Sequence, residues 1–263
     1  MLVDSHCHLD MLAEREDLDA VLDRARAAGV GTLVTISTKL SSFDGVRAVA
    51  ERYPEVWCTV GVHPHEAGAE GQGSPERLLA LAEDPRVVGI GESGLDYHYD
   101  LSPRAAQQES FRAHIRAAQA TGLPLVVHAR EADADIAAIL QEERARGGPI
   151  RGVMHCFSSG PALARAALEL GFYISFSGIV TFKKAEQLRE IAHETPRARL
   201  LVETDAPYLA PVPKRGRPNE PAYVAYTAAH LAETLALSAE DLAAVTTENF
   251  FRLFDRAVPP GSA

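Results

Sequence analysis

The segment Val3-Asp4-Ser5-His6-Cys7-His8-Leu9-Asp10 places two histidines, two residues apart, at the end of a short apolar run. In an extended strand, residues i and i+2 point to the same side, so His6 and His8 can converge on one metal ion while Cys7 points away. A single pair of this kind is equally typical of ordinary surface or core histidines. The segment therefore predicts a strand, and it leaves a metal site as one of two interpretations.

Residue types that bind metals recur at the ends of later strand-like runs. These runs, each with the residue that ends it, are 87–92 with Glu92, 125–128 with His128, 152–155 with His155, and 200–205 with Asp205. Packing alone does not explain why imidazoles and carboxylates repeatedly stand at this position. The recurrence favours the metal interpretation and predicts a metalloenzyme.

Strand-like and helix-like stretches alternate along the whole chain. Strands are expected to begin near Leu2, Thr32, Val56, Val87, Leu125, Gly152, Phe172 and Leu200. Polar, Ala-rich stretches of helical period lie between them, for example over residues 18–28 and 132–146. Ser102-Pro103 predicts the start of a helix that ends before Gly122. Ser238, with Asp241 three residues later, predicts the start of the last helix.

Eight strand–helix units within about 205 residues, without an internal linker, predict an α/β fold: a single (β/α)8 TIM-type barrel with additional C-terminal helices. Residues 1–263 then form one catalytic domain, and residues from about 257 to 263 form a flexible tail. A doubly wound open sheet is the alternative, but no Gly-rich phosphate loop follows the first strand.

Composition narrows the classes of function. The chain has 263 residues, of which 46% are hydrophobic and 24% are charged, and 36 acidic against 26 basic residues give a formal charge of −10. This balance argues against nonspecific duplex binding through a broad basic face. It allows a nucleic-acid substrate held locally by metal ions, because bound divalent cations reverse the local field.

The three cysteines, Cys7, Cys58 and Cys156, have no CxxC spacing, and we expect small buried residues in a reducing compartment rather than a disulfide framework. Cys156 should face away from His155 on the same strand. No run approaches 18 uninterrupted apolar residues, so no membrane span is expected. Strand-like sequence from Leu2 onwards leaves no room for a signal peptide, and a cytoplasmic location is expected.

The barrel prediction brings the scattered candidates to one place, because the carboxyl ends of barrel strands share the face that carries the active site. His6 and His8 would follow the first strand, and the other four candidates, Glu92, His128, His155 and Asp205, would follow the fourth, fifth, sixth and eighth strands. Four imidazoles and two carboxylates suffice for two divalent ions that share one bridging acid. This ligand set suits Zn²⁺, Mn²⁺, Fe²⁺ or Mg²⁺.

Further residues on the same face are weaker candidates. Glu203 should share a side with Asp205, as Asp4 does with His6, and each could hold a further cation or orient a ligand, although a buried ion pair explains Glu203 almost as well. His63, Arg130 and the loop around Arg215 could contact a substrate phosphate. Ordinary solvated loop charge is the competing interpretation for the basic residues.

The ordered set of motifs resembles the TatD family of metal-dependent deoxyribonucleases, within the wider amidohydrolase-like barrel group. The matching stretches are Asp4-Ser5-His6-Cys7-His8-Leu9-Asp10, Gly61-Val62-His63-Pro64-His65, Gly89-Ile90-Gly91-Glu92-Ser93-Gly94-Leu95-Asp96-Tyr97, Pro124-Leu125-Val126-Val127-His128-Ala129-Arg130, His155-Cys156-Phe157-Ser158-Ser159-Gly160, Glu203-Thr204-Asp205-Ala206-Pro207-Tyr208-Leu209, Asn219-Glu220-Pro221 and Thr247-Glu248-Asn249-Phe250-Phe251. The resemblance implies that His6, His8, Glu92 and Asp205 hold one metal, and that Glu92, His128 and His155 hold the other. Glu92 would bridge the two ions, and Asp205 would also serve as general base.

Three functions follow from these predictions. The favoured one is a divalent-metal-dependent phosphodiesterase that hydrolyses DNA ends, with two Mg²⁺, Mn²⁺ or Zn²⁺ ions and single-stranded ends as substrate. The second is a small-molecule or aminoacyl-ester hydrolase, because a metal-activated water attacks a carbonyl equally well. The third, a binding barrel with structural zinc, is disfavoured because structural zinc sites close four ligands around one ion. No membrane and no obligate protein partner are expected.

Overall fold

In the computed structural model, which describes residues 1–70 and 75–261, parallel strands form one eight-stranded sheet in the order β1 to β8. The strands are β1 (Leu2–Cys7), β2 (Val30–Thr35), β3 (Val56–Val60), β4 (Val87–Asp96), β5 (Leu125–Arg130), β6 (Gly152–Met154), β7 (Tyr173–Phe176) and β8 (Leu200–Val202). A parallel bridge between Cys7 and Ala206, with the His8 N–H donating to the Ala206 carbonyl at 2.8 Å, brings the two edges together. The predicted (β/α)8 barrel is therefore confirmed.

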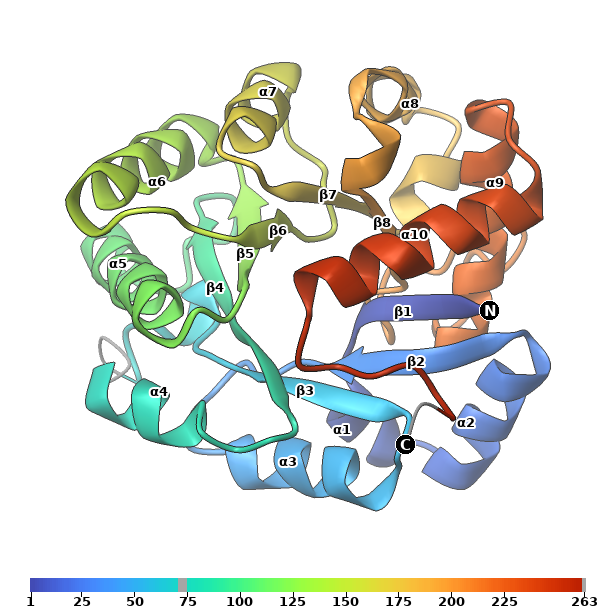
Figure 1. Ribbon diagram of the computed structural model, residues 1–263, viewed down its shortest axis with the longest axis horizontal. Helices are drawn as coiled ribbons and strands as arrows, with labels where there is room; N and C mark the ends of the chain where they lie inside the picture. The colour runs from blue at the N-terminus through green and yellow to red at the C-terminus, as the bar shows by residue number, and fades with distance from the viewer. Residues whose placement is uncertain (71–74, 262–263) are drawn as a thin grey trace.

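Helices surround the strands on the outside of the barrel (Figure 1). The α-helices of the described ranges are α1 (Leu9–Ala13), α2 (Leu18–Ala27), α3 (Phe43–Arg52), α4 (Pro75–Leu81), α5 (Arg104–Thr121), α6 (Asp133–Gly147), α7 (Pro161–Glu169), α8 (Glu186–Glu194), α9 (Val224–Thr234) and α10 (Ala239–Leu253). Short 3₁₀ turns cover Pro64–Glu66, Gly178–Thr181, Arg197–Arg199 and Pro221–Tyr223. The predicted helices over 18–28 and 132–146 correspond to α2 and α6.

The start of α5 differs by one residue from the prediction. Pro103, not Ser102, is the N-cap. The Ser102 hydroxyl is used elsewhere, since it donates to the His65 carbonyl at 2.7 Å and accepts from the Gly68 N–H at 3.0 Å. The predicted end is confirmed, because Gly122 is the C-cap with a left-handed φ of 73°.

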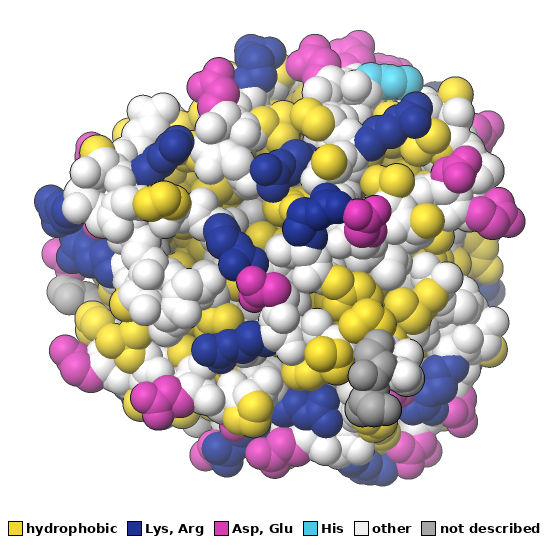
Figure 2. Space-filling view, in the orientation of Figure 1, with side chains coloured by type: hydrophobic (Ala, Val, Ile, Leu, Met, Phe, Trp, Pro, Cys, Tyr) yellow, Lys and Arg dark blue, Asp and Glu magenta, His cyan; other side chains and the backbone are white. Residues whose placement is uncertain are grey.

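The C-terminal helix α10 closes the end of the barrel at which the strands begin. Its cap is as predicted, with the Ser238 hydroxyl accepting from the Asp241 N–H at 2.9 Å. One face of α10 packs on side chains from inside the barrel; this cluster comprises Val3, Val34, Ile36, Trp57, Val88, Val126, Val153, Tyr173 and Leu201 with Phe250, Leu253, Phe254 and Ala257. Figure 1 shows α10 lying across this end, and Figure 2 shows that Lys, Arg, Asp and Glu side chains of both signs are spread over the same face.

The predicted flexible tail, residues 257–263, belongs to the segment that follows α10. Ala257 is buried against the α10 cluster, whereas Val258 is 52% exposed. Residues 262–263 lie outside the described residues, and the flexibility of the tail stays a prediction. No described helix has the length and apolar character that crossing a membrane requires.

Candidate active site

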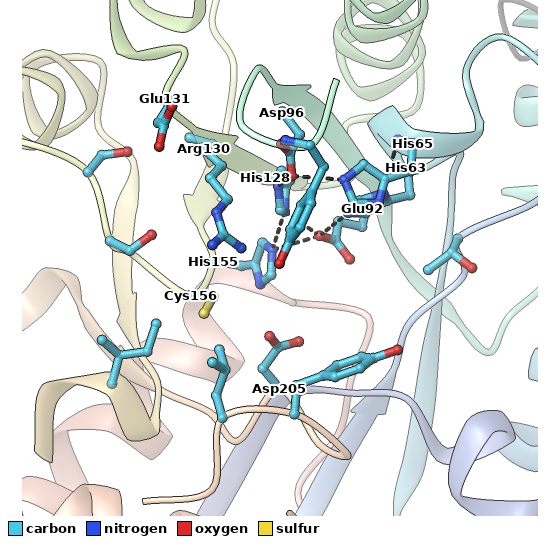
Figure 3. A pocket seen from close by; sticks show the side chains of 18 of the residues that line it. His63, His65, Glu92, Asp96, His128, Arg130, Glu131, His155, Cys156 and Asp205 are labelled. Atoms are coloured by element: carbon cyan, nitrogen blue, oxygen red, sulfur yellow. Dashed lines mark hydrogen bonds and ion pairs between the residues drawn. The ribbon is translucent and has the colours of Figure 1, made fainter. Parts of the chain in front are cut away.

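A pocket of about 1050 Å³ opens at the end of the barrel where the strands finish. Its wall carries residues from β4, β5 and the loops that follow β1, β3, β6 and β8, and Figure 3 shows their side chains converging. Among the predicted site residues, His8, His63, Glu92, His128, Arg130, His155 and Asp205 line this pocket. These predicted residues come from six of the eight strand ends, and Thr38 and Ile179, which follow β2 and β7, line the same pocket, as the barrel topology predicts.

Glu92 lies at the centre of the cluster, and its two carboxylate oxygens face different groups of imidazoles. Oε1 lies 2.7 Å from His155 Nε2, 3.0 Å from His128 Nδ1 and 3.4 Å from His63 Nε2. Oε2 lies 3.4 Å from His6 Nε2 on the other side. The side chain is 3% exposed, so these imidazoles, rather than water, surround the carboxylate.

His6, His8 and Asp205 form the second part of the cluster. Asp205 Oδ1 lies 3.4 Å from His8 Nε2 and 3.6 Å from His6 Nε2. The Asp205 N–H donates to the His6 carbonyl at 2.9 Å, and this contact fixes a backbone with φ of 59° that Asp tolerates better than most residues. These ligand atoms lie close enough together to hold one metal ion.

Strand β4 does not end at Glu92 as predicted but continues to Asp96. The extension requires close contact with β5: a Cβ on Gly94 would lie 1.9 Å from the His128 carbonyl oxygen, and one on Gly91 would lie 2.5 Å from that of Val126. Both glycines also have positive φ values. The alternation of apolar and polar residues does not predict this extension, and Asp96 is not among the predicted site residues.

Asp96 and Glu203 orient the imidazoles that face Glu92. His128 turns Nδ1 towards Glu92 and Nε2 towards Asp96 Oδ2, at 3.2 Å. His155 turns Nε2 towards Glu92 and Nδ1 towards Glu203 Oε1, at 3.3 Å. An outer carboxylate on the far nitrogen is the usual way in which proteins fix the tautomer and orientation of a metal-binding histidine. Glu203 thus contacts one of the candidate ligands, and its role in orienting a metal ligand stays a prediction.

Asp4 supports the loop after β8 rather than reaching the pocket. Its Oδ1 accepts from the Thr204 N–H at 2.8 Å, and its Oδ2 contacts the Thr204 hydroxyl at 2.6 Å. The carboxyl is fully buried, and burial raises its pKa to about 8 against the opposing effect of these hydrogen bonds. Because Thr204 lies between Glu203 and Asp205, Asp4 helps to fix the backbone of both.

The electrostatics of the cluster favour bound positive charge. Burial alone would raise the pKa of Glu92, but the imidazoles of His155 and His63 hold it well below its ordinary value. Burial likewise opposes ionisation of Asp205, and the hydrogen bond from His8 holds its pKa below the ordinary value. The pKa of His155 is well above its ordinary value because Glu92 and Glu203 outweigh the effect of burial. The buried carboxylates are therefore stabilised here by positive charge, either on protonated imidazoles or on bound metal ions.

Buried polar atoms test whether the cluster fits metal ions. His6 is 1% exposed, yet among the described residues neither of its ring nitrogens has a partner in hydrogen-bond geometry. Glu203 Oε2 is also buried without such a partner. Orphaned buried polar groups are rare in native structures and often mark an ion. Imidazole and carboxylate donors in this arrangement suit borderline to hard divalent cations, so the residues present fit the predicted ions.

The weaker candidates are divided between the pocket and the surface. His63 Nε2 lies 3.4 Å from Glu92 Oε1, so His63 lies among the predicted metal ligands. Arg130 extends into the pocket with its guanidinium 4.7 Å from the centre of the Tyr99 ring (Figure 3). Arg215 is not among the residues that line the pocket, and its guanidinium lies 3.8 Å from the Phe182 ring centre instead. Arg215 thus stacks on Phe182 and does not line the pocket, where the sequence had placed it as a phosphate contact.

The cysteines follow the prediction in two cases out of three. Cys7 and Cys58 are free and fully buried. Cys156 is only partly buried and lines the pocket, with its Sγ 3.2 Å from the Ser177 hydroxyl. The expected alternation fails because β6 ends at Met154, and Cys156 lies in a turn with φ of 42°.

An eight-stranded barrel whose strand ends carry buried imidazoles and carboxylates defines the class of metal-dependent barrel hydrolases. The family model described as TatD-related DNase matches residues 3–255. The chain is 46% identical over 259 residues to the uncharacterized metal-dependent hydrolase YcfH of Escherichia coli (strain K12), across 96% of this chain and 95% of that protein. It therefore belongs to the TatD-related DNase family and is a metal-dependent hydrolase.

Two further relatives carry more specific descriptions. The chain is 38% identical over 251 residues to the 3'-5' ssDNA/RNA exonuclease TatD of Cronobacter turicensis, across 93% of this chain and 94% of that protein. The crystal structure of the TatD homologue YJJV from Escherichia coli K12 superposes with a TM-score of 0.90 at 32% identity, across 98% of each chain. The resemblance drawn from the motifs is confirmed.

Proposed function

We propose that this hydrolase is a phosphodiesterase that removes nucleotides from single-stranded DNA ends with two divalent ions. One ion would be held by His6, His8, Glu92 and Asp205, and the other by Glu92, His128 and His155. Bound there, the ions would supply an activated water and stabilise the negative charge that develops on the phosphoryl oxygens and the leaving group. Mg²⁺, Mn²⁺ and Zn²⁺ are the candidates.

The position of Glu92 carries this proposal. Its two oxygens face two separate groups of nitrogen ligands, Oε2 towards His6 and Oε1 towards His128 and His155. A carboxylate between two ligand groups is suited to share two cations. A structural zinc site would instead surround one ion with four ligands, so the divided arrangement favours catalysis.

Asp205 is the residue best suited to accept the proton of the attacking water. Its side chain is 13% exposed, whereas that of Glu92 is 3% exposed, so Asp205 borders the open pocket. Its contact with His8 Nε2 at 3.4 Å fixes the carboxylate beside the predicted ion. Its low pKa keeps it ionised at neutral pH, so it is present as the base.

Nucleic acid is the proposed substrate because relatives and charge agree. One relative is named as an exonuclease on single-stranded DNA and RNA. The net charge of −10 disfavours a broad duplex-binding face, whereas Arg130 and two cations would concentrate positive charge within the pocket. A flexible strand end can enter such a pocket and place its terminal phosphates at the ions.

The test is a turnover panel on the purified protein. DNA oligonucleotides, RNA oligonucleotides, aminoacyl esters and phosphotriesters are compared at equal enzyme concentration, before and after EDTA and with Mg²⁺ or Mn²⁺ restored. We expect hydrolysis of single-stranded DNA, its loss in EDTA and its recovery with metal. Arg130→Ala should raise the apparent KM for DNA while metal content stays the same. Full activity of metal-depleted protein would contradict the two-metal proposal, and efficient ester turnover with untouched DNA would contradict the substrate.

A further inference from the structure

Two tyrosine rings in the wall of the pocket are half exposed. Tyr99 is 53% exposed and Tyr208 is 49% exposed, and both line the pocket. Exposed aromatic rings that gather in a concave site commonly indicate a binding surface, because their faces are apolar and polarisable. Tyr226 is also exposed, at 38%, but it does not line the pocket.

The two rings lie beside different parts of the cluster of imidazoles and carboxylates. The Tyr208 ring lies 6.1 Å from the His8 ring, centre to centre, in an edge arrangement. The Tyr99 ring lies 5.5 Å from the His65 ring, also in an edge arrangement. His8 belongs to the group around Asp205, whereas His65 shares Asp96 Oδ2 with His128. One ring therefore borders each of the two ligand groups that Glu92 separates.

The backbone of each tyrosine is tied directly to a carboxylate residue of the site. The Tyr99 N–H donates to Asp96 Oδ1 at 2.8 Å. The Tyr208 N–H donates to the Asp205 carbonyl at 2.9 Å, and its own carbonyl accepts from Asn219 Nδ2 at 2.6 Å. These contacts fix the backbone from which each ring projects relative to the cluster. Binding then requires little further ordering of the protein, which favours affinity.

Arg130 completes the arrangement on the Tyr99 side. Its guanidinium lies 4.7 Å from the centre of the Tyr99 ring, in cation–π contact. The pocket thus brings four features together: the Tyr99 ring, the Arg130 guanidinium, the cluster of imidazoles and carboxylates, and the Tyr208 ring. Single-stranded nucleic acid alternates bases with phosphates, and proteins bind it with positive grooves and aromatic stacking surfaces.

We infer that Tyr99 and Tyr208 are two stacking surfaces for nucleobases, one on each side of the phosphodiester that is hydrolysed. The inference rests on the nuclease function proposed above and extends it to the bases. Each ring would stack on a base exposed by an unpaired strand end, whereas a base inside a duplex offers no free face. Stacking is tolerant of base identity because every base has an aromatic face, so the site would accept any sequence.

The experiment measures the apparent KM of matched tyrosine variants on matched strands. The strands are a thymidine oligonucleotide and the same strand with one tetrahydrofuran abasic residue, either at the terminal position or next to it. The variants are Tyr99→Ala and Tyr208→Ala, with Tyr99→Phe and Tyr208→Phe to keep each ring. Tyr226→Ala is the control, an exposed tyrosine outside the pocket.

Each Ala variant should raise the KM for the intact strand, on the order of 5- to 150-fold, while the Phe variants and Tyr226→Ala should resemble the parent protein. Each Ala variant should have no effect on the strand that lacks the base contacted by its ring, because the lost interaction is the one between that ring and that base. An unchanged KM in both Ala variants would overturn the inference. So would an equal increase on all strands, because the rings would then act only by positioning Asp96 and Asp205. Failure of the parent protein to cleave any strand would instead refute the nuclease proposal itself, and the inference with it.

Discussion

At the end of the barrel where the strands begin, Phe250 of α10 and Phe254, which caps this helix, pack on valine, isoleucine and leucine side chains from the barrel interior. At the opposite end, Glu92 and Asp205 are surrounded by imidazoles. The side chains of both clusters are largely buried, but only those of the first are apolar. Burying a large apolar side chain stabilises a fold by about 1.5–3 kcal/mol, whereas burying carboxylates opposes folding unless cations compensate them. The end under α10 thus contributes mainly to the stability of the fold, and the opposite end carries the groups suited to catalysis.

The division predicts that substitutions at the two ends affect different properties. Changes in the polar cluster should affect metal affinity and turnover, and changes under α10 should affect the free energy of unfolding. Four substitutions test this contrast, and their expected effects on turnover decrease from Glu92→Gln to Phe254→Ala.

Glu92→Gln should have the largest effect on turnover. The amide has one oxygen instead of two, and it carries no charge to compensate ions on either side. We expect a loss of turnover of at least about 10³-fold and a loss of bound metal, measured by steady-state kinetics and elemental analysis. Glu131→Gln, an exposed carboxylate in the pocket wall, is the matched control and should keep its metal. Normal metal content and turnover in Glu92→Gln would show that the bridging role is wrong.

Asp205→Asn should lower kcat by about 10²–10⁴-fold, the usual contribution of a general base. The amide keeps the shape of the side chain but cannot accept the proton. KM for DNA should change much less than kcat, and metal content is checked in the same preparation. A loss below about tenfold with metal retained would reassign the base, and Glu203 would be the next residue to test.

Asp96→Asn should act through the metal rather than through the substrate. Asp96 accepts from His128 Nε2 and from His65 Nε2, at 3.2 and 2.8 Å, so its loss frees the orientation of His128. Outer-ligand substitutions of this kind weaken metal affinity by about 10–100-fold. Calorimetric titration of the metal-depleted protein with Mn²⁺ measures this directly. Asp135→Asn removes a carboxylate that contacts Tyr97 outside the pocket lining, and it serves as control. Unchanged Mn²⁺ affinity in Asp96→Asn would leave Asp96 with a purely structural role.

Phe254→Ala should have the smallest effect on turnover and a large one on stability. The ring is fully buried under the barrel, and such truncations lower the free energy of unfolding by about 3–5 kcal/mol. Urea denaturation measures the loss, and the folded protein should turn over DNA as before. Val258→Ala, at an exposed site four residues later, should change stability by less than about 0.5 kcal/mol. Impaired metal binding in folded Phe254→Ala would show that the two ends are not independent.

The same contrast explains what the sequence could and could not predict. Alternating apolar runs with histidines or acids at their ends predicted the barrel and brought His6, His8, Glu92, His128, His155 and Asp205 to one place, because strand ends in a barrel share a face. The role of Asp96 escaped because β4 continues past Glu92 through Gly94, where contact with β5 rather than an apolar pattern holds the strand.

Loop residues were predicted less well than strand residues. Alternation does not extend into the turn that carries Cys156, so its side chain lies in the pocket wall instead of the core. Arg215 was placed near the pocket from its position after β8, but its stacking on Phe182 depends on a tertiary contact that sequence spacing does not reveal. His63 lines the pocket beside Glu92, and its contact with a substrate phosphate stays a prediction.

Anomalous diffraction from crystals of the protein grown with Mn²⁺ tests the central claim most directly. If Glu92 bridges two ions, two anomalous peaks should appear in the pocket. One should lie against Glu92 Oε2 with His6, His8 and Asp205, and the other against Oε1 with His128 and His155. A single peak, or peaks that do not contact Glu92, would contradict the two-metal account.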